Sequence, residues 1–361
     1  MNVHLQEEPV ISAIRKTLIA TGCAAAVLTS ATACDPVENA SAAHQVDEAV
    51  EQLGEQRSLT VEFGLDADAA TLEKLIQDSE DRQDPQEQEG EGAESGGGDG
   101  PPPGFGAFLS KARVQMSLQS EKPLADAEEK DFTGTSMRIT GADGTLLEYR
   151  ALGEDMYYRA DLAAFGKLAD TPMPSAADLP EEAGALRSAL QGKWVKVDPK
   201  MLPGPARDEP AIDEKTQAKL LKGIRRVLAR EVRFKEHGDS DGTSRITAKA
   251  NARSLLTRLA DKLEPMAGDL PPGTELPTAE DFKSVPKKQV KVDFVLKDGK
   301  LRKITFDLAQ LADKSDGLEK GTKLPLTMKF GKAPKIERPA EATELTMSDL
   351  MFIAGSQSAM R

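Results

Sequence analysis

The chain has 361 residues, a formal net charge of −13 and an aromatic content of only 4%. The acidic balance argues against nucleic acid as a partner, which requires clustered lysine and arginine, and against electrostatic adhesion to anionic lipid. The length allows one large domain or two small ones, and the scarcity of aromatic residues requires a core built largely from aliphatic side chains, methionine and phenylalanine.

The N-terminal segment has the parts of a secretory signal peptide. An uncharged, largely apolar run over 17–33 follows two basic residues and ends in the small residues Ala31-Thr32-Ala33. Cys34 comes next, and cleavage before it would leave a mature chain with a single cysteine. An odd cysteine is a liability in an oxidising compartment unless it is acylated or pairs between chains. We therefore predict a signal peptide over 1–33 and an exported lipoprotein, held at the outer face of the cell membrane by an acyl group, such as palmitate, on Cys34.

Other interpretations of this segment stay open. The Ala-x-Ala pattern also suits ordinary signal peptidase, which would give a plain secreted protein, and an uncleaved run would act as an anchor. Cys23 is a competing acylation site, but the apolar run between Lys16 and Cys23 is too short for a signal peptide. Translation could begin at Met1 or at the codon for Val10, because acidic residues between them are unusual in a signal peptide.

The first part of the mature chain predicts a tether, two helices and a strand. Residues 34–44 form the tether, apolar spacings of three and four predict a helix over 45–56, and 67–79 predicts a second helix. Between the helices, 58–65 alternates apolar and polar residues, as a half-buried strand does. The stretch 80–106 is acidic and then rich in glycine and proline, so it predicts a disordered loop without a packed core.

The rest of the chain consists mainly of strand-like segments separated by turns. Strands are expected over 112–118, 136–140, 145–151, 155–160, 193–198, 230–235, 243–250 and 324–330. Helices are expected over 162–168, 181–190, 213–229 and 252–264, the last one capped by Asn251. The clearest element is a β-hairpin over 289–308 with Asp298-Gly299 in its turn. One domain over 45–339 is therefore predicted, followed by a tail over 340–361 with few structural signals.

The sequence offers few residues or motifs that could support catalysis. His44 and His237 have no partner at metal-ligand spacing, and no cysteine follows Cys34, so the usual zinc sites are excluded. The chain also lacks a Walker loop and the dinucleotide-binding Gly-x-Gly-x-x-Gly. The segment Gly238 to Gly242 has Gly-x-Ser-x-Gly spacing, but it is expected to be a turn between two strands and not the strand-to-helix turn that carries a hydrolase nucleophile. We predict a protein without metal, cofactor or enzymatic activity. His237 is expected in a solvated turn, and the basic cluster over 222–226 as solvated helix charge, with contact to phospholipid head groups as the minority interpretation.

One face of a curved antiparallel sheet must be covered, either by the protein's own helices or by a ligand. If the helices over 213–229 and 252–264 fill that side, the core is closed. If they leave space, the cavity would accept an acyl chain at roughly 0.8 kcal/mol per buried methylene. Strand alternation predicts that such a cavity is lined by Trp194, Val292, Phe294, Phe306, Leu326 and Met328.

The layout resembles that of lipoproteins with the LolA-like carrier fold, in the actinobacterial LprG/LppX-type branch. The resemblance covers most of the mature chain and is carried by the order of elements more than by motifs. A leading helix is followed by Val61-Glu62-Phe63, a meander ending at 155–159, a tryptophan strand over 192–198, the 293–307 hairpin and Phe330-Gly331-Lys332. It implies an α+β fold, a curved antiparallel half-open β-barrel covered by several helices, which carries lipid or glycolipid. The acidic loop at 80–106 departs from this pattern, and the resemblance transfers no ligand-contact residue.

Together these expectations describe a monomeric cell-envelope lipoprotein that binds or carries a lipid or other apolar ligand between sheet and helices. Its partners would be the membrane, through the N-terminal lipid anchor, and the ligand itself. The alternative is a surface-tethered interaction or scaffold lipoprotein with a filled core and no small ligand.

Overall fold

The structure, a computed structural model, describes residues 37–80, 104–168, 176–177, 179–180, 183–201, 214–265, 276–283, 285–312, 318–319 and 321–352. The predicted signal peptide, the predicted acylation site Cys34 and residues 81–103 of the predicted loop lie outside the described residues.

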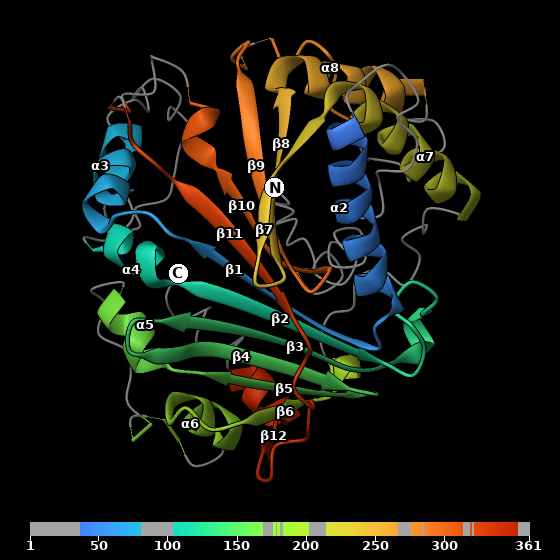
Figure 1. Cartoon of the computed structure of the whole chain (residues 1–361). Helices are drawn as coiled ribbons and strands as arrows, with labels where there is room; N and C mark the ends of the chain where they lie inside the picture. Colours follow the sequence, from blue (N-terminus) through green and yellow to red (C-terminus); the bar gives the residue numbers. More distant parts are fainter. Residues whose placement is uncertain are drawn as a thin grey trace.

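The described chain forms an α+β fold around one twelve-stranded sheet, as Figure 1 shows. The strands lie in the order β12-β6-β5-β4-β3-β2-β1-β11-β10-β9-β8-β7, so β12 and β7 are free edges and the sheet does not close. All neighbours are antiparallel except β12 and β6. The predicted α+β class and antiparallel pairing are confirmed. The strands are β1 (Ser58–Leu65), β2 (Arg113–Ser120), β3 (Phe132–Gly141), β4 (Gly144–Leu152), β5 (Asp155–Ala160), β6 (Val195–Val197), β7 (Arg233–Ser240), β8 (Thr243–Asn251), β9 (Gln289–Lys297), β10 (Lys300–Asp307), β11 (Pro325–Gly331) and β12 (Thr343–Glu344).

The α-helices pack around this sheet and at its ends. They are α2 (Val37–Glu55), α3 (Ala69–Glu80), α4 (Phe105–Lys111), α5 (Leu162–Leu168), α6 (Gly184–Leu190), α7 (Glu214–Glu231) and α8 (Ala252–Leu263). The predicted cap of α8 is confirmed, because the Asn251 side chain accepts a hydrogen bond from the Ser254 amide at 3.0 Å.

Two helical segments differ from the prediction. Helix α2 begins at Val37, inside the predicted tether, because Ala42 joins Val46 and Ala49 on the face that packs against the sheet. The short helix α4 is not among the predicted elements, and its first two residues, Phe105 and Gly106, fall within the predicted loop. The carboxylate of Glu73 on α3 holds its start by accepting a hydrogen bond from the Gly106 amide at 2.9 Å.

The predicted tail is also more structured than expected. Strand β12 adds to the edge strand β6, and a helical turn over 347–352 follows it. Asp349, only 1% exposed, accepts hydrogen bonds from the amide of Ala185 at 3.1 Å and from the amide of Thr346 at 2.9 Å. A buried carboxylate with several donors fixes this turn against α6.

The main core lies where α2 crosses the end of the sheet that contains β7 to β10. Val46 and Val50 of α2 pack with Ile246, Leu296 and Leu301, all nearly inaccessible to solvent. Full burial of each such side chain stabilises the fold by about 1.5–3 kcal/mol. In Figure 1 the strands β7 to β10 run steeply while β2 to β6 run across the view, so the sheet turns strongly between its two halves.

The two halves of the sheet are joined through β1 and β11. These strands come from near opposite ends of the described chain and pair in register from Thr60 with Gly331 to Leu65 with Leu326. On either side of this junction, most neighbouring strands follow one another directly in sequence.

Candidate functional site

One face of the sheet is apolar along continuous rows. Residues directly opposite each other on paired strands project to the same face, so the register defines these rows. One row is Ile246, Phe294, Ile304, Met328, Phe63, Val114, Ile139 and Leu147. A second row is Phe330, Val61, Met116, Met137, Tyr149, Tyr158 and Val195. We call the surface formed by these rows the apolar face.

Other parts of the protein cover the two ends of the apolar face more completely than its middle. Helix α2 buries the end at Ile246, and the segments around α6 and Leu345 pack against Val195 at the other end. Between them, Val61 on β1 is buried, but six of the other apolar side chains on β11, β1, β2 and β3 are only half-buried. They are Met328, Phe63, Val114, Ile139, Met116 and Met137. A line of half-buried large apolar side chains marks the part of the sheet where a hydrocarbon could add contacts.

The structure brings five of the six predicted cavity residues together. Val292, Phe294, Phe306, Leu326 and Met328 lie on the adjacent strands β9, β10 and β11, and all five side chains are half-buried. Cross-strand pairs connect them, for instance Phe306 with both Val292 and Leu326. Alternation along the strands was sufficient to assign these residues to one face.

Trp194 is separate from the other five, and its predicted place in the cavity is corrected. Its ring lies beneath the guanidinium groups of Arg150 and Arg159, with 4.5 Å and 5.0 Å from each guanidinium carbon to the ring centroid. Both arginines are chain neighbours of tyrosines on the apolar face, so they project from the opposite face. Cation–π contact with two arginines therefore holds Trp194 on the polar side of the sheet.

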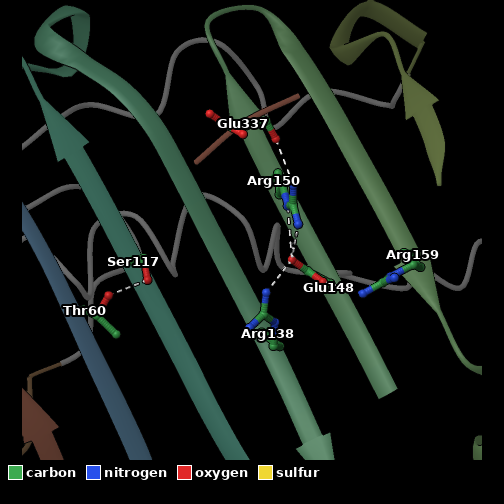
Figure 2. A network of polar contacts seen from close by, with 7 residues as sticks. All are labelled: Thr60, Ser117, Arg138, Glu148, Arg150, Arg159 and Glu337. Carbon is green, nitrogen blue, oxygen red and sulfur yellow. Dashed lines mark hydrogen bonds and ion pairs between the residues drawn. The ribbon is translucent and has the colours of Figure 1, made fainter. Parts of the chain in front are cut away.

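That polar side carries an arginine cluster around one buried carboxylate, shown in Figure 2. Glu148 on β4 is 1% exposed. Its Oε1 accepts hydrogen bonds from Arg138 Nη2 at 2.9 Å and Arg150 Nη2 at 2.8 Å, and its Oε2 accepts one from Arg159 Nη2 at 2.7 Å. The three arginines come from β3, β4 and β5, so the carboxylate ties three adjacent strands together.

This cluster is suited to structure rather than to proton transfer. Burial alone would raise the pKa of the Glu148 carboxyl, but hydrogen bonds from Arg138 and Arg150 and their positive charges outweigh burial and hold the pKa below its ordinary value. A general acid or base needs a pKa near the working pH. Glu148 is therefore a permanently charged anchor at neutral pH.

The other candidates for chemistry are isolated from one another. His237 lies in β7 rather than in the following turn, with its Nε2 2.9 Å from Thr247 Oγ1. His44 Nε2 lies 3.4 Å from Glu48 Oε1 on the exposed side of α2. Within the described ranges, no group of three or more metal-ligating side chains occurs. No helix in this part of the chain combines the length and apolarity needed to cross a bilayer.

Comparison with protein-family models and with curated proteins gives no match to this chain. The apolar face and the N-terminal sequence are therefore the two features from which a function can be inferred.

Proposed function

We propose that the protein is an exported, lipid-anchored carrier that holds a lipid acyl chain against the apolar face of its sheet and does not transform it. In this proposal the strongly turned sheet acts as a half-open barrel, and the helices cover the ligand from the other side. The observation that carries the proposal is the half-buried line of apolar side chains on β11, β1, β2 and β3, between two covered ends.

The chemistry of this line favours hydrocarbon over other ligands. Its six side chains are aliphatic, methionine or phenylalanine, and none of them ionises or provides a nucleophile. Methionine is flexible and polarisable, so Met116, Met137 and Met328 can adapt to chains of different length. Burying about ten methylenes here would contribute roughly 8 kcal/mol before the entropy cost of binding is subtracted.

The same considerations separate this proposal from an enzymatic one. The almost fully buried carboxylate of Glu148 lies on the opposite face and is held ionised by its arginines. An acyl chain on the apolar face would be bound away from that charge. Binding without covalent change is the simplest use of such a surface.

Native mass spectrometry of the purified full chain tests the proposal. We expect a lipid adduct on the wild-type protein and its loss in Met116→Glu, because the new carboxylate would have to be buried beside the hydrocarbon. Gln115→Glu is the matched control: it adds the same charge one residue earlier on β2, on the polar face. A bare mass for wild type, or equal adducts in both variants, would refute the carrier.

A second function remains supported by one specific observation. Helix α2 fills the apolar face so completely at β7 to β10 that Ile246 and Leu301 are each 1% exposed. If the rest of the face is filled to the same degree, the protein would be a surface-tethered scaffold that works through protein contacts. A bare mass together with a folded, lipid-anchored protein would favour this alternative.

A further inference from the structure

A basic groove lies between helices α7 and α8, on the part of the protein that covers one end of the sheet. It has a volume of about 330 Å³. Its lining consists of Arg226, Val227, Arg230 and Glu231 from α7 and Arg258, Asp261 and Lys262 from α8. Four cations and two carboxylates give it a local charge of +2, in a chain whose formal net charge is −13.

Three of the four cations in the groove are available to a ligand. Arg258 is engaged, because its Nε lies 2.9 Å from Glu231 Oε1, and the other oxygen of Glu231 accepts a hydrogen bond from Ser254. Arg226, Arg230 and Lys262 are exposed, and none of them has an ion-pair partner in the part of the chain that the structure describes. Arg226 and Arg230 are four residues apart, so they form a line along one side of α7.

The groove lies close to the point where the chain leaves toward its predicted anchor. Asn39, near the start of α2, is 8% exposed and accepts a hydrogen bond from the Phe234 amide at 2.6 Å. Phe234 follows the last residue of α7 by three positions, and Figure 1 shows the upper end of α2 beside α7. Cys34 lies three residues before Val37, the first residue of α2, so even a fully extended link would carry it at most about 11 Å from the start of this helix.

We infer that the basic groove between α7 and α8 docks on the membrane surface by binding the phosphate groups of anionic phospholipids. The inference rests on the proposed acylation of Cys34, which would bring this end of the protein to the bilayer. Exposed arginine and lysine side chains near a lipid surface attract anionic head groups over about one Debye length, near 8 Å at physiological salt. The acidic remainder of the protein is repelled by the same surface, so the groove also fixes which side faces the membrane.

The tether and the groove would act together. An acyl anchor holds the groove at a high local concentration of head groups, so weak electrostatic contacts suffice to orient the protein. A single acyl chain gives only marginal and reversible membrane binding, and a basic patch is a common second contribution. This accounts for a locally basic groove in an acidic protein.

Vesicle sedimentation of the chain over residues 35–361, which lacks both the predicted signal peptide and Cys34, tests the groove without an anchor. Vesicles of phosphatidylcholine containing one third phosphatidylglycerol should bind this protein at low salt, and pure phosphatidylcholine should not. The triple variant Arg226→Gln, Arg230→Gln, Lys262→Gln should bind the anionic vesicles about one hundredfold more weakly, since each charge near the surface contributes about a fivefold factor.

A second triple variant controls for net charge. Lys300→Gln, Arg302→Gln, Lys332→Gln removes the same three charges from exposed positions on the β9–β10 hairpin and after β11. It should bind as the parent does, while circular dichroism shows both variants folded. Equal weakening by both triples, or no binding of the parent to anionic vesicles, would overturn the inference. If inorganic phosphate raised the thermal midpoint of the parent protein but the parent did not bind vesicles, the groove would be a site for a soluble anion, and this result would also overturn the inference. None of these outcomes depends on whether the apolar face holds a lipid or Cys34 is acylated in the cell.

Discussion

Replacing Glu148 by glutamine should weaken the fold at neutral pH and leave it nearly unchanged in acid. The substitution removes the carboxylate that the three arginines share. Because the new amide has a single acceptor oxygen, it cannot accept hydrogen bonds both from Arg138 and Arg150 on one side and from Arg159 on the other. Breaking a fully buried ion pair costs about 3–5 kcal/mol. The side chains of Arg138, Arg150 and Arg159 are 41%, 23% and 38% exposed, so water compensates part of the loss. We expect about 2 kcal/mol, a figure below the range for full burial.

The direction of the pKa shift determines how this loss of stability depends on pH. The pKa of Glu148 is lowered in the folded protein, so its contribution is complete above the pKa of an unfolded glutamate, about 4.3. That contribution is lost as pH falls through the lower pKa of the folded state. Urea unfolding of wild type and Glu148→Gln should therefore show a difference in unfolding free energy that is constant near neutrality and shrinks in acid.

Glu154→Gln is the matched control, because this exposed glutamate lies in the neighbouring β4–β5 turn. It should change the unfolding free energy by less than about 0.5 kcal/mol, as surface substitutions usually do. A difference for Glu148→Gln that stayed the same from neutral to acid pH would show that packing, not charge, explains its effect.

Three further outcomes are expected. Cys34→Ser should abolish membrane anchoring, so that the protein appears in the medium or as an uncleaved precursor; normal maturation with unchanged membrane retention in cell fractionation would contradict the anchor. Asn39→Ala should lower the unfolding free energy by about 1–3 kcal/mol, because the buried amide of Phe234 loses its acceptor; an unchanged thermal midpoint would contradict this. Asp349→Ala should release the last helical turn from Ala185, seen as faster amide exchange over 343–352 with slow exchange retained in β1; uniform acceleration would instead indicate a global effect.

The sequence was most informative where alternation and turn residues agree. The predicted bounds of β1 and β5 match the structure, and Asp298 and Gly299 both have positive φ, as the predicted tight hairpin turn requires. Such elements depend on neighbours in sequence. Predictions failed where the deciding contact is distant: the alanine-rich stretch around Ala42 lacks a strong apolar periodicity, and its burial depends on strands far along the chain.

The arginine cluster shows a second limit. A two-residue turn after Leu152 places Arg159 opposite Glu148, so the predicted hairpin accounts for the contact between these two residues. Arg138 reaches Glu148 only because the register between β3 and β4 shifts between Ile139 and Thr140. An irregularity of one residue leaves no clear signal in the sequence, and without it Arg138 would face Leu147. Trp194 was misassigned because it precedes a strand of only three residues.

The pairing of β1 with β11 has a consequence for how the protein is made. Strands β2 to β5 and β7 to β10 form local hairpins, each of which can assemble soon after its residues emerge. The β1–β11 ladder joins residues separated by most of the chain, so closing it carries a larger loop entropy and should be the slow step. Until that step, the unpaired edges of β1 and β11 expose backbone hydrogen-bonding groups, and the apolar face is incomplete at the junction. A newly made chain would therefore be most vulnerable to aggregation and proteases during this interval.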